Sequence, residues 1–254
     1  MMLIKLGGSA ITDKSKPLTS RAGDIKRLAM EIAGAEGTKM IVHGGGSFGH
    51  IKAAEFKLNE GFVDDSQRKG ICLVQKDMRK LNAIVVDAFR EAGVPVASVP
   101  AGAITLFDNG QMVKFPSEVF IHYVKLGIVP ITFGDVVVDR ARGISICSGD
   151  DIMLQLAKDT DAVKCVFVTS VDGIFESYPP GKDEEPLSEV GPDTVIRFSS
   201  EDVDVTGSMK RKLDLMIEMA SSGKEVAVVN GLVPDRLTDA LKGNDFIGTR
   251  VKGD

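Results

Sequence analysis

The sequence has no tryptophan, only three cysteines and three histidines, and no apolar run long enough to span a bilayer. Cys72, Cys147 and Cys165 are far apart and odd in number, which excludes a zinc-ligand pattern and a disulfide framework. We expect small, buried, reduced side chains in a cytoplasmic protein. The apolar start, MMLIKLGGSA, is short and interrupted by a lysine and two glycines, which favours a first strand over a signal peptide.

Positive charge is also scarce. The chain has 31 lysines and arginines against 36 acidic residues, a net charge of −5, and its basic clusters carry no interleaved aromatic residues. This composition argues against a nucleic-acid partner, and nothing in it favours a membrane partner. A mildly acidic protein still binds phosphate where a few lysines converge, because the local field steers the ligand. With 254 residues, the chain can form one α/β domain or two close-packed lobes.

Short β-branched runs alternate with amphipathic helical stretches along the chain, as is typical of a largely parallel sheet with helices on both faces. An Asn-Gly pair inside 107–115 indicates a hairpin, and 177–194 is a polar excursion. We expect strands within 2–8, 39–43, 94–100 (buried), 127–139 (two), 162–175, 224–231 and 248–251, and helices within 22–37, 66–92, 148–162 and 206–223.

The first of three glycine-bearing turns is KLGGSAITDK, with Lys5 on the strand, Gly7, Gly8 and Ser9 in the turn, and Lys14 beyond it. A strand-to-helix glycine turn presents backbone N–H groups to an anion. Lys5 lies among apolar neighbours, and a buried lysine needs an anionic partner. A phosphate at the glycine turn would supply that partner.

The second turn is VHGGGSFGH, whose glycines fit the spacing G-x-G-x-x-G of a dinucleotide-binding loop, with two acidic residues following at 64–65. The motif lacks the Gly-Lys-Ser/Thr ending of a P-loop, which excludes a Walker site. We expect His43 to be structural. His50, just beyond the loop, is expected to donate to a phosphate oxygen. A nicotinamide-dependent oxidoreductase stays open here as an alternative.

The third turn is DVTGSMKRK, in which Gly207 opens the turn and three cations fall in the first helical turns. Cations oppose the dipole at a helix N-terminus, which favours an anionic ligand there. SGDD adds Gly149, Asp150 and Asp151 at the start of another helix. One aspartate is expected to cap that helix, and the other to hold lysines in position or to reach Mg²⁺ through water.

Taken together, these motifs resemble the amino acid kinase superfamily, and within it the isopentenyl phosphate kinases. KLGGSAITDK, HGGGSFGH, FGDV at 133–136, SGDDIM, TSVDGIF, DVTGSM and GTRV occur in family order over nearly the whole chain. HGGGSFGH and SGDD are the narrower signals, shared with the related fosfomycin kinases. The resemblance implies an open αβα sandwich with a mostly parallel central sheet, and transfer of the ATP γ-phosphoryl group to isopentenyl phosphate. The product would be isopentenyl diphosphate, the terpenoid precursor.

The resemblance also assigns roles to residues. Lys5, Lys14 and His50 would be catalytic, with Lys5 and Lys14 on the transferring phosphoryl group. The acceptor phosphate would be bound by His50 with Gly45, Gly49 and Gly149. Ile71 and Val74, on the helix after the His50 loop, are our choice for contacts with the apolar tail. ATP would contact Lys5, Gly7, Gly8, Ser9, Gly46, Ser170, Asp172, Gly207 and Lys212, while Asp150 and Asp151 would organise the site.

Two positions depart from the family pattern: Ser170 where an aspartate is frequent, and Ser208 where a second glycine is frequent. We expect one domain over 1–254, with the acceptor site in a lobe at 1–165 and the nucleotide site in a lobe at 166–254. Mg²⁺ would arrive with ATP and have no direct protein ligand, and a homodimer is expected. A same-fold kinase for another small phosphate or phosphonate, such as fosfomycin, and a non-catalytic anion-binding protein remain alternatives.

Overall fold

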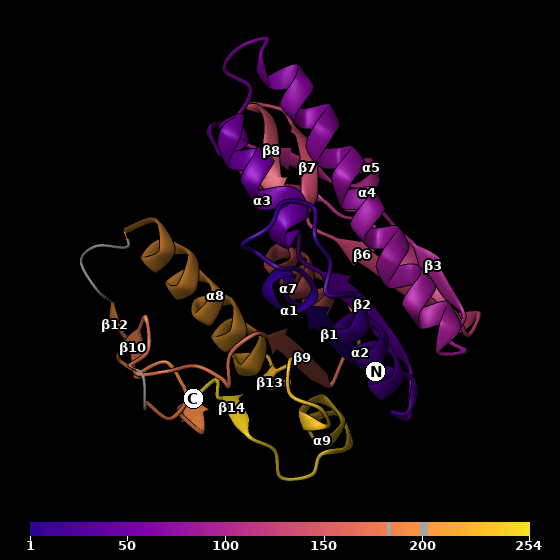
Figure 1. The fold of residues 1–254 in the computed structure, drawn as a ribbon, viewed down its shortest axis with the longest axis vertical. Helices are drawn as coiled ribbons and strands as arrows, with labels where there is room; N and C mark the ends of the chain where they lie inside the picture. The colour runs from indigo at the N-terminus through magenta and orange to yellow at the C-terminus, as the bar shows by residue number, and fades with distance from the viewer. Residues whose placement is uncertain (182–183, 199–202) are drawn as a thin grey trace.

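The computed structural model describes residues 1–181, 184–198 and 203–254, giving only the backbone course at 198 and 203–208. Its main sheet has eight strands in the order β11-β14-β13-β9-β1-β2-β6-β3 (Figure 1). Every neighbouring pair is parallel except β13 with β14, so the prediction of a mostly parallel sheet is confirmed. In that order the strands span Glu189–Val190, Gly248–Val251, Glu225–Asn230, Lys164–Thr169, Met2–Leu6, Lys39–His43, Val129–Phe133 and Val96–Ser98.

Helices cover both faces of this sheet, because side chains on each central strand alternate between two apolar cores. On β1, Ile4 and Leu6 belong to one core, while Leu3 belongs to the other. Figure 1 shows α4 beside β3 and β6, and α8 beside β13 and β9. The first core is covered by α1 (Gly8–Ile11), α2 (Ala22–Ala33), α3 (Gly46–Glu55), α4 (Gln67–Glu91) and α9 (Arg236–Lys242); the second by α5 (Ala101–Ile104), α6 (Ser117–Lys125), α7 (Gly149–Asp159) and α8 (Val203–Ser221).

A second sheet of four strands has the order β5-β4-β7-β8. The predicted hairpin is confirmed: Asn109 and Gly110 both have positive φ, 49° and 78°, as a tight turn of this kind requires. The two strands predicted around Gly134 are also present, but β6 belongs to the main sheet and β7 to the second. The remaining short elements are β4 (Leu106–Asp108), β5 (Gln111–Lys114), β7 (Asp135–Asp139), β8 (Gly143–Cys147), β10 (Ser177–Tyr178), β12 (Arg197–Phe198) and the 3₁₀ turn at Leu58–Glu60.

Three expectations about local structure were wrong. The strand within 94–100 is not buried, because β3 is the edge strand of the main sheet and its residues are partly or fully exposed. The glycine run of VHGGGSFGH opens a helix at Gly46, so Gly49 and His50 lie on α3 and not in or beyond a loop. Helix α8 begins at Val203, so Gly207 lies inside it and the following cations lie beyond its first turn.

The lobe boundary expected between residues 165 and 166 falls within β9, and the main sheet continues on both sides of that strand. All three cysteines are free. Cys147 and Cys165 are buried as expected, whereas Cys72 is exposed on α4. Among the helices the structure describes, none is both long and apolar enough to cross a membrane.

Candidate active site

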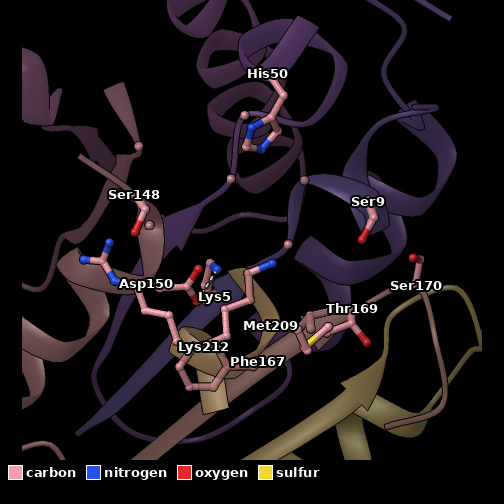
Figure 2. Close-up of a pocket in the computed structure, with 18 of the residues that line it drawn as sticks. Lys5, Ser9, His50, Ser148, Asp150, Phe167, Thr169, Ser170, Met209 and Lys212 are labelled. Atoms are coloured by element: carbon pink, nitrogen blue, oxygen red, sulfur yellow. Dashed lines mark hydrogen bonds and ion pairs between the residues drawn. The ribbon is translucent and has the colours of Figure 1, made fainter. Parts of the chain in front are cut away.

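One cavity of about 710 Å³ lies where the ends of β1 and β9 meet the starts of α1, α3 and α7, with α8 along one side. Figure 2 shows His50 on one side of this space and Lys5 and Lys212 on the opposite side. Ser9 and Ser170 lie on a third side, between His50 and the two lysines. Of the residues predicted for the site, those lining the cavity are Lys5, Gly7, Gly8, Ser9, Lys14, Gly45, Gly49, His50, Val74, Gly149, Asp150, Ser170 and Lys212.

Lys5 reaches the cavity because strand alternation turns it away from Ile4 and Leu6. Its Nζ lies 2.6 Å from Asp150 Oδ1 and 5.8 Å from the centre of the Phe167 ring. One aspartate of SGDD was expected to hold lysines in position, and Asp150 does so for Lys5. That Lys5 also meets a phosphate stays a prediction. Burial alone would raise the pKa of Asp150, but the charge and hydrogen bond of Lys5 outweigh burial and hold that pKa below its ordinary value.

Three helices begin at the wall of the cavity. Gly7 precedes α1, Gly45 precedes α3 and Ser148 precedes α7, and all three residues line the cavity. The first N–H groups of a helix have no partner within the helix, and the helix dipole is positive at that end. The cavity therefore has the backbone geometry of an anion site at more than one point on its wall.

His50 lies on α3 with its side chain exposed to the cavity. Loss of hydration lowers its pKa below 6.5, and the charges of Lys14, Lys212 and Lys5 lower it further, opposed by Asp150. Burial lowers the pKa of Lys212 too, with Lys5 and Lys14 contributing, again opposed by Asp150. These four basic groups thus act on one another across the cavity, and a polyanion would relieve their repulsion.

The comparisons with known proteins agree with this geometry. Residues 1–230 match the amino acid kinase family. The chain belongs to that family. It is 39% identical to the isopentenyl phosphate kinase of Thermoplasma acidophilum, over 99% of this chain and 100% of the relative, and 32% identical to that of Methanothermobacter thermautotrophicus, over 100% and 99%. A solved isopentenyl phosphate kinase superposes with a TM-score of 0.86 at 29% identity, covering 99% of this chain and 100% of that one.

The family's fold is therefore the fold predicted, and the nicotinamide-dependent alternative is excluded. Some residues expected in the kinase site do not line the cavity. Gly46 has a φ of +47° and is buried between Thr12 and Gly8. Ile71 packs on the core beneath α4, one turn before Val74. Of the two α4 residues chosen for the substrate tail, only Val74 borders the cavity.

Two acidic residues also lie outside the cavity lining. Asp151 forms a capping box with Ser148 at the start of α7 and pairs with Arg211 of α8 at 2.5 Å. Asp172 forms an ion pair with Arg236 and accepts a hydrogen bond of 2.7 Å from Asn230. Capping by one of the two SGDD aspartates was expected, and the structure shows that it is Asp151. The side-chain surroundings of Gly207 and Ser208 lie outside the described residues.

Sequence reasoning missed most of the apolar wall of this kinase's cavity. Near His50 the wall is formed by Ala53, Val74, Met78 and Ile146. Met78 lies one helical turn after Val74 on α4, and Ile146 comes from β8, a strand that the sequence analysis did not predict. Further apolar lining comes from Ile174, Tyr178, Ile196, Met209, Leu213 and Met216.

Asp135 of the FGDV motif was also missed as a cavity residue. Its carboxylate lies 3.1 Å from Arg79 of α4. Burial raises its pKa to about 6, although the charge of Arg79 opposes the rise. This carboxyl group connects α4 to the second sheet beside the cavity.

His43 has the structural role expected of it. It is fully buried at the end of β2 and stacks on Phe133 with ring centres 5.0 Å apart. Its Nδ1 lies 3.0 Å from the Gly44 carbonyl oxygen, which can only accept, so Nδ1 carries the proton and Nε2 accepts from Asn82 at 3.2 Å. Burial lowers the pKa of His43 to about 4.

This shift predicts how stability depends on pH. Between pH 4 and 6.5 the unfolded chain binds a proton at His43 that the folded protein does not, so the free energy of unfolding rises with pH. The contribution is about 3 kcal/mol, at about 1.4 kcal/mol per pKa unit. Urea unfolding across this range should give a smaller rise for His43→Gln than for the natural protein, and the same rise in both would contradict the assignment. Asp135, whose raised pKa acts in the opposite direction, is common to both proteins and cancels in the comparison.

Proposed function

We propose that the protein transfers the γ-phosphoryl group of ATP to isopentenyl phosphate, giving isopentenyl diphosphate and ADP. One observation carries the proposal: His50 and three lysines face a single cavity, and apolar residues of α3, α4 and β8 and a second apolar group from residues 174–216 also line it. Such a cavity suits two phosphate groups that meet in its middle, each with a less polar group behind it. Its full-length relatives, which are isopentenyl phosphate kinases, support the same reaction.

In the proposed complex His50 binds the acceptor phosphate, together with backbone groups at Gly45, Gly49 and Gly149. Because the pKa of His50 lies below 6.5, its imidazole is neutral at pH 7 in the free protein and donates one N–H. The negative charge of the phosphate then favours uptake of a second proton. A charge-assisted hydrogen bond of this type contributes about 1.5–3 kcal/mol.

Lys5, Lys14 and Lys212 are proposed to neutralise the charge that spreads over the transferring group. An oxygen of the acceptor phosphate attacks the γ-phosphorus, and the bond from phosphorus to the bridging oxygen of ADP breaks. Phosphoryl transfer depends mainly on positioning and electrostatic stabilisation. The acceptor is a phosphate monoester that is largely ionised at neutral pH, so the reaction needs no strong general base. The cavity is rich in lysines, and its two carboxylates among the described residues, Asp135 and Asp150, are both paired, which fits this chemistry.

For ATP we propose that Gly7, Gly8, Ser9 and Ser170 border the phosphates and ribose, and that the apolar residues around Met209 surround the base. We also propose, as the sequence predicted, that ATP contacts Gly46, Asp172 and Gly207. Mg²⁺ is expected to enter on the ATP phosphates, where it offsets their charge. The cavity carboxylates favour this arrangement, because Asp150 is paired with Lys5 and Asp135 with Arg79.

The apolar tail of the acceptor is proposed to lie against Val74, Met78 and Ala53. Enlarging Val74 to phenylalanine should fill this space and raise the KM for isopentenyl phosphate about tenfold or more, since pockets of this kind discriminate by single methylene groups. The Kd for ADP should not change. Ile71→Val, one turn away and outside the lining, is the matched control. Equal effects of the two substitutions on KM would refute the placement of the tail.

The test of the proposed function is an acceptor panel with ATP and Mg²⁺, in which ADP release is measured for each compound. The panel contains isopentenyl phosphate, fosfomycin, inorganic phosphate and aspartate. We expect the highest kcat/KM with isopentenyl phosphate. Turnover of another acceptor without turnover of isopentenyl phosphate would overturn the specific assignment, and turnover of none would favour a non-catalytic role. A homodimer and a cytoplasmic location stay predictions, the first tested by light scattering.

A further inference from the structure

The two glycine turns that face the cavity are packed backbone against backbone. A Cβ added to Gly8 would lie 2.4 Å from the Gly46 nitrogen, and one added to Gly44 would lie 2.7 Å from the Gly8 nitrogen. Real Cβ atoms do not approach so closely, so close backbone contact requires glycine at both positions. The turn before α1 and the turn before α3 therefore form one unit.

Thr12 forms hydrogen bonds to both turns of this unit. Its side chain is completely buried. The hydroxyl donates to the Gly8 carbonyl oxygen at 2.7 Å and accepts the backbone N–H of Ser47 at 3.0 Å. A Cβ on Gly46 would lie 2.0 Å from the same hydroxyl oxygen, which shows how closely α3 sits on it. One threonine hydroxyl thus connects α1 to the first turn of α3.

A third segment meets the same place. Ser47 Oγ lies 3.4 Å from both the N–H and the carbonyl oxygen of Thr19, and the N–H of Leu18 donates to the Ser47 carbonyl. Asp13 N–H donates to the Thr19 carbonyl, which closes the loop that carries Lys14. Contacts of Thr12 and Ser47 therefore reach all three segments: the turn at Gly8, the loop of Lys14 and the helix of His50.

We propose that Thr12 is a positioning residue for phosphoryl transfer: through its bonds to Gly8 and Ser47 it sets the distance between the acceptor phosphate on His50 and the phosphoryl group near Gly8 and Lys14. The proposal rests on the proposed function of the cavity. Thr12 does not line the cavity and touches neither substrate directly. Thr12 instead affects the distance between the acceptor phosphate and the phosphoryl group, and in-line transfer is sensitive to displacements of about 1 Å.

The test compares Thr12→Val, which keeps the shape and removes the hydroxyl, with Thr12→Ser, which keeps the hydroxyl. The matched control is Thr132→Val, because Thr132 is equally buried and its hydroxyl has no hydrogen-bond partner among the described residues. Thermal unfolding, kcat, and the Kd of ADP and of isopentenyl phosphate, each measured alone, are recorded for all four proteins.

We expect Thr12→Val to lower kcat roughly ten- to hundredfold. Each Kd should stay near that of the natural protein, because each substrate still meets an intact half of the site. Thr12→Ser and Thr132→Val should keep kcat near the natural value. An unchanged kcat in Thr12→Val would overturn the proposal, as would a loss that follows a rise in one Kd alone.

If Thr12→Val does not fold, Thr12→Ala provides the same comparison with a smaller side chain. If the natural protein phosphorylates a different acceptor from the panel, the measurements are made with that acceptor. That result would contradict the proposed function without touching the role of Thr12, whereas equal kcat values in Thr12→Val and Thr12→Ser would contradict the role of Thr12 alone.

Discussion

Replacing Lys5 with methionine is expected to lower kcat roughly 10²- to 10³-fold, the range typical of removing one group that stabilises charge in the transition state. Methionine keeps the length of the side chain but removes the ammonium group that faces the cavity. The variant should also be less stable by about 3–5 kcal/mol, because the carboxylate of Asp150 is left buried without its partner. Only a tenth of either side chain is exposed, so solvent screens this pair little.

A double variant separates the two effects. Lys5→Met combined with Asp150→Asn removes the stranded charge, and should recover part of the lost stability while kcat stays low. Lys16→Met is the control, since Lys16 is exposed and lies 3.9 Å from its partner Asp13. The experiment measures urea unfolding and steady-state kinetics for all three variants. Recovery of kcat in the double variant would mean that Lys5 acts only through the fold, which contradicts its proposed place at the transferring phosphoryl group.

Replacing His50 with alanine is expected to lower kcat/KM for isopentenyl phosphate about ten- to hundredfold. This is the loss of one charge-assisted hydrogen bond of about 1.5–3 kcal/mol, expressed as a rate. The Kd for ATP should be nearly unchanged or slightly lower, because His50 is proposed to bind only the acceptor. Stability should change little, since no hydrogen bond from the His50 ring to another described residue is lost.

The control for His50 is His122→Ala, because His122 is an exposed histidine on α6, on the other face of the sheet. It should leave both kinetic constants unchanged. Steady-state kinetics with each substrate varied in turn, together with calorimetry of ATP binding, tests whether His50 binds only the acceptor. An equal loss of ATP binding and acceptor use in His50→Ala would show that the histidine does not belong to the acceptor subsite.

The sequence predicted best those features that a local pattern sets directly. The alternation along β1 turns Lys5 away from one core. The Asn109-Gly110 pair fixes a hairpin because both positions need positive φ. Ser148 and Asp151 stand three residues apart and form the capping box at α7. In each case the physical cause lies within a few residues of the feature, so the local sequence is enough to predict that feature.

Features decided by distant contacts were not predictable in this way. β3 is exposed because it is last in the sheet, and the sequence VPVASVP does not indicate the strand order. Ile71 and Val74 belong to one apolar stripe of α4, yet only the packing of α3 against α4 determines which of them meets the cavity. The sequence suggested that an aspartate of SGDD holds lysines in position, but only the fold shows that Asp150 pairs with Lys5, 145 residues away. No sequence pattern indicates a role for Thr12, because its hydrogen bonds to Gly8 and Ser47 are known only from the fold.

The central claim is that this cavity joins the γ-phosphoryl group of ATP to an acceptor phosphate held by His50. Phosphorus NMR of the protein with ATP, Mg²⁺ and isopentenyl phosphate tests it most directly, because it detects the new phosphorus-oxygen-phosphorus bond itself. We predict that the monoester signal is replaced by the two coupled signals of a diphosphate as ADP accumulates, and that His50→Ala slows this conversion about ten- to hundredfold. ADP accumulating with inorganic phosphate while the monoester signal persists would contradict the account.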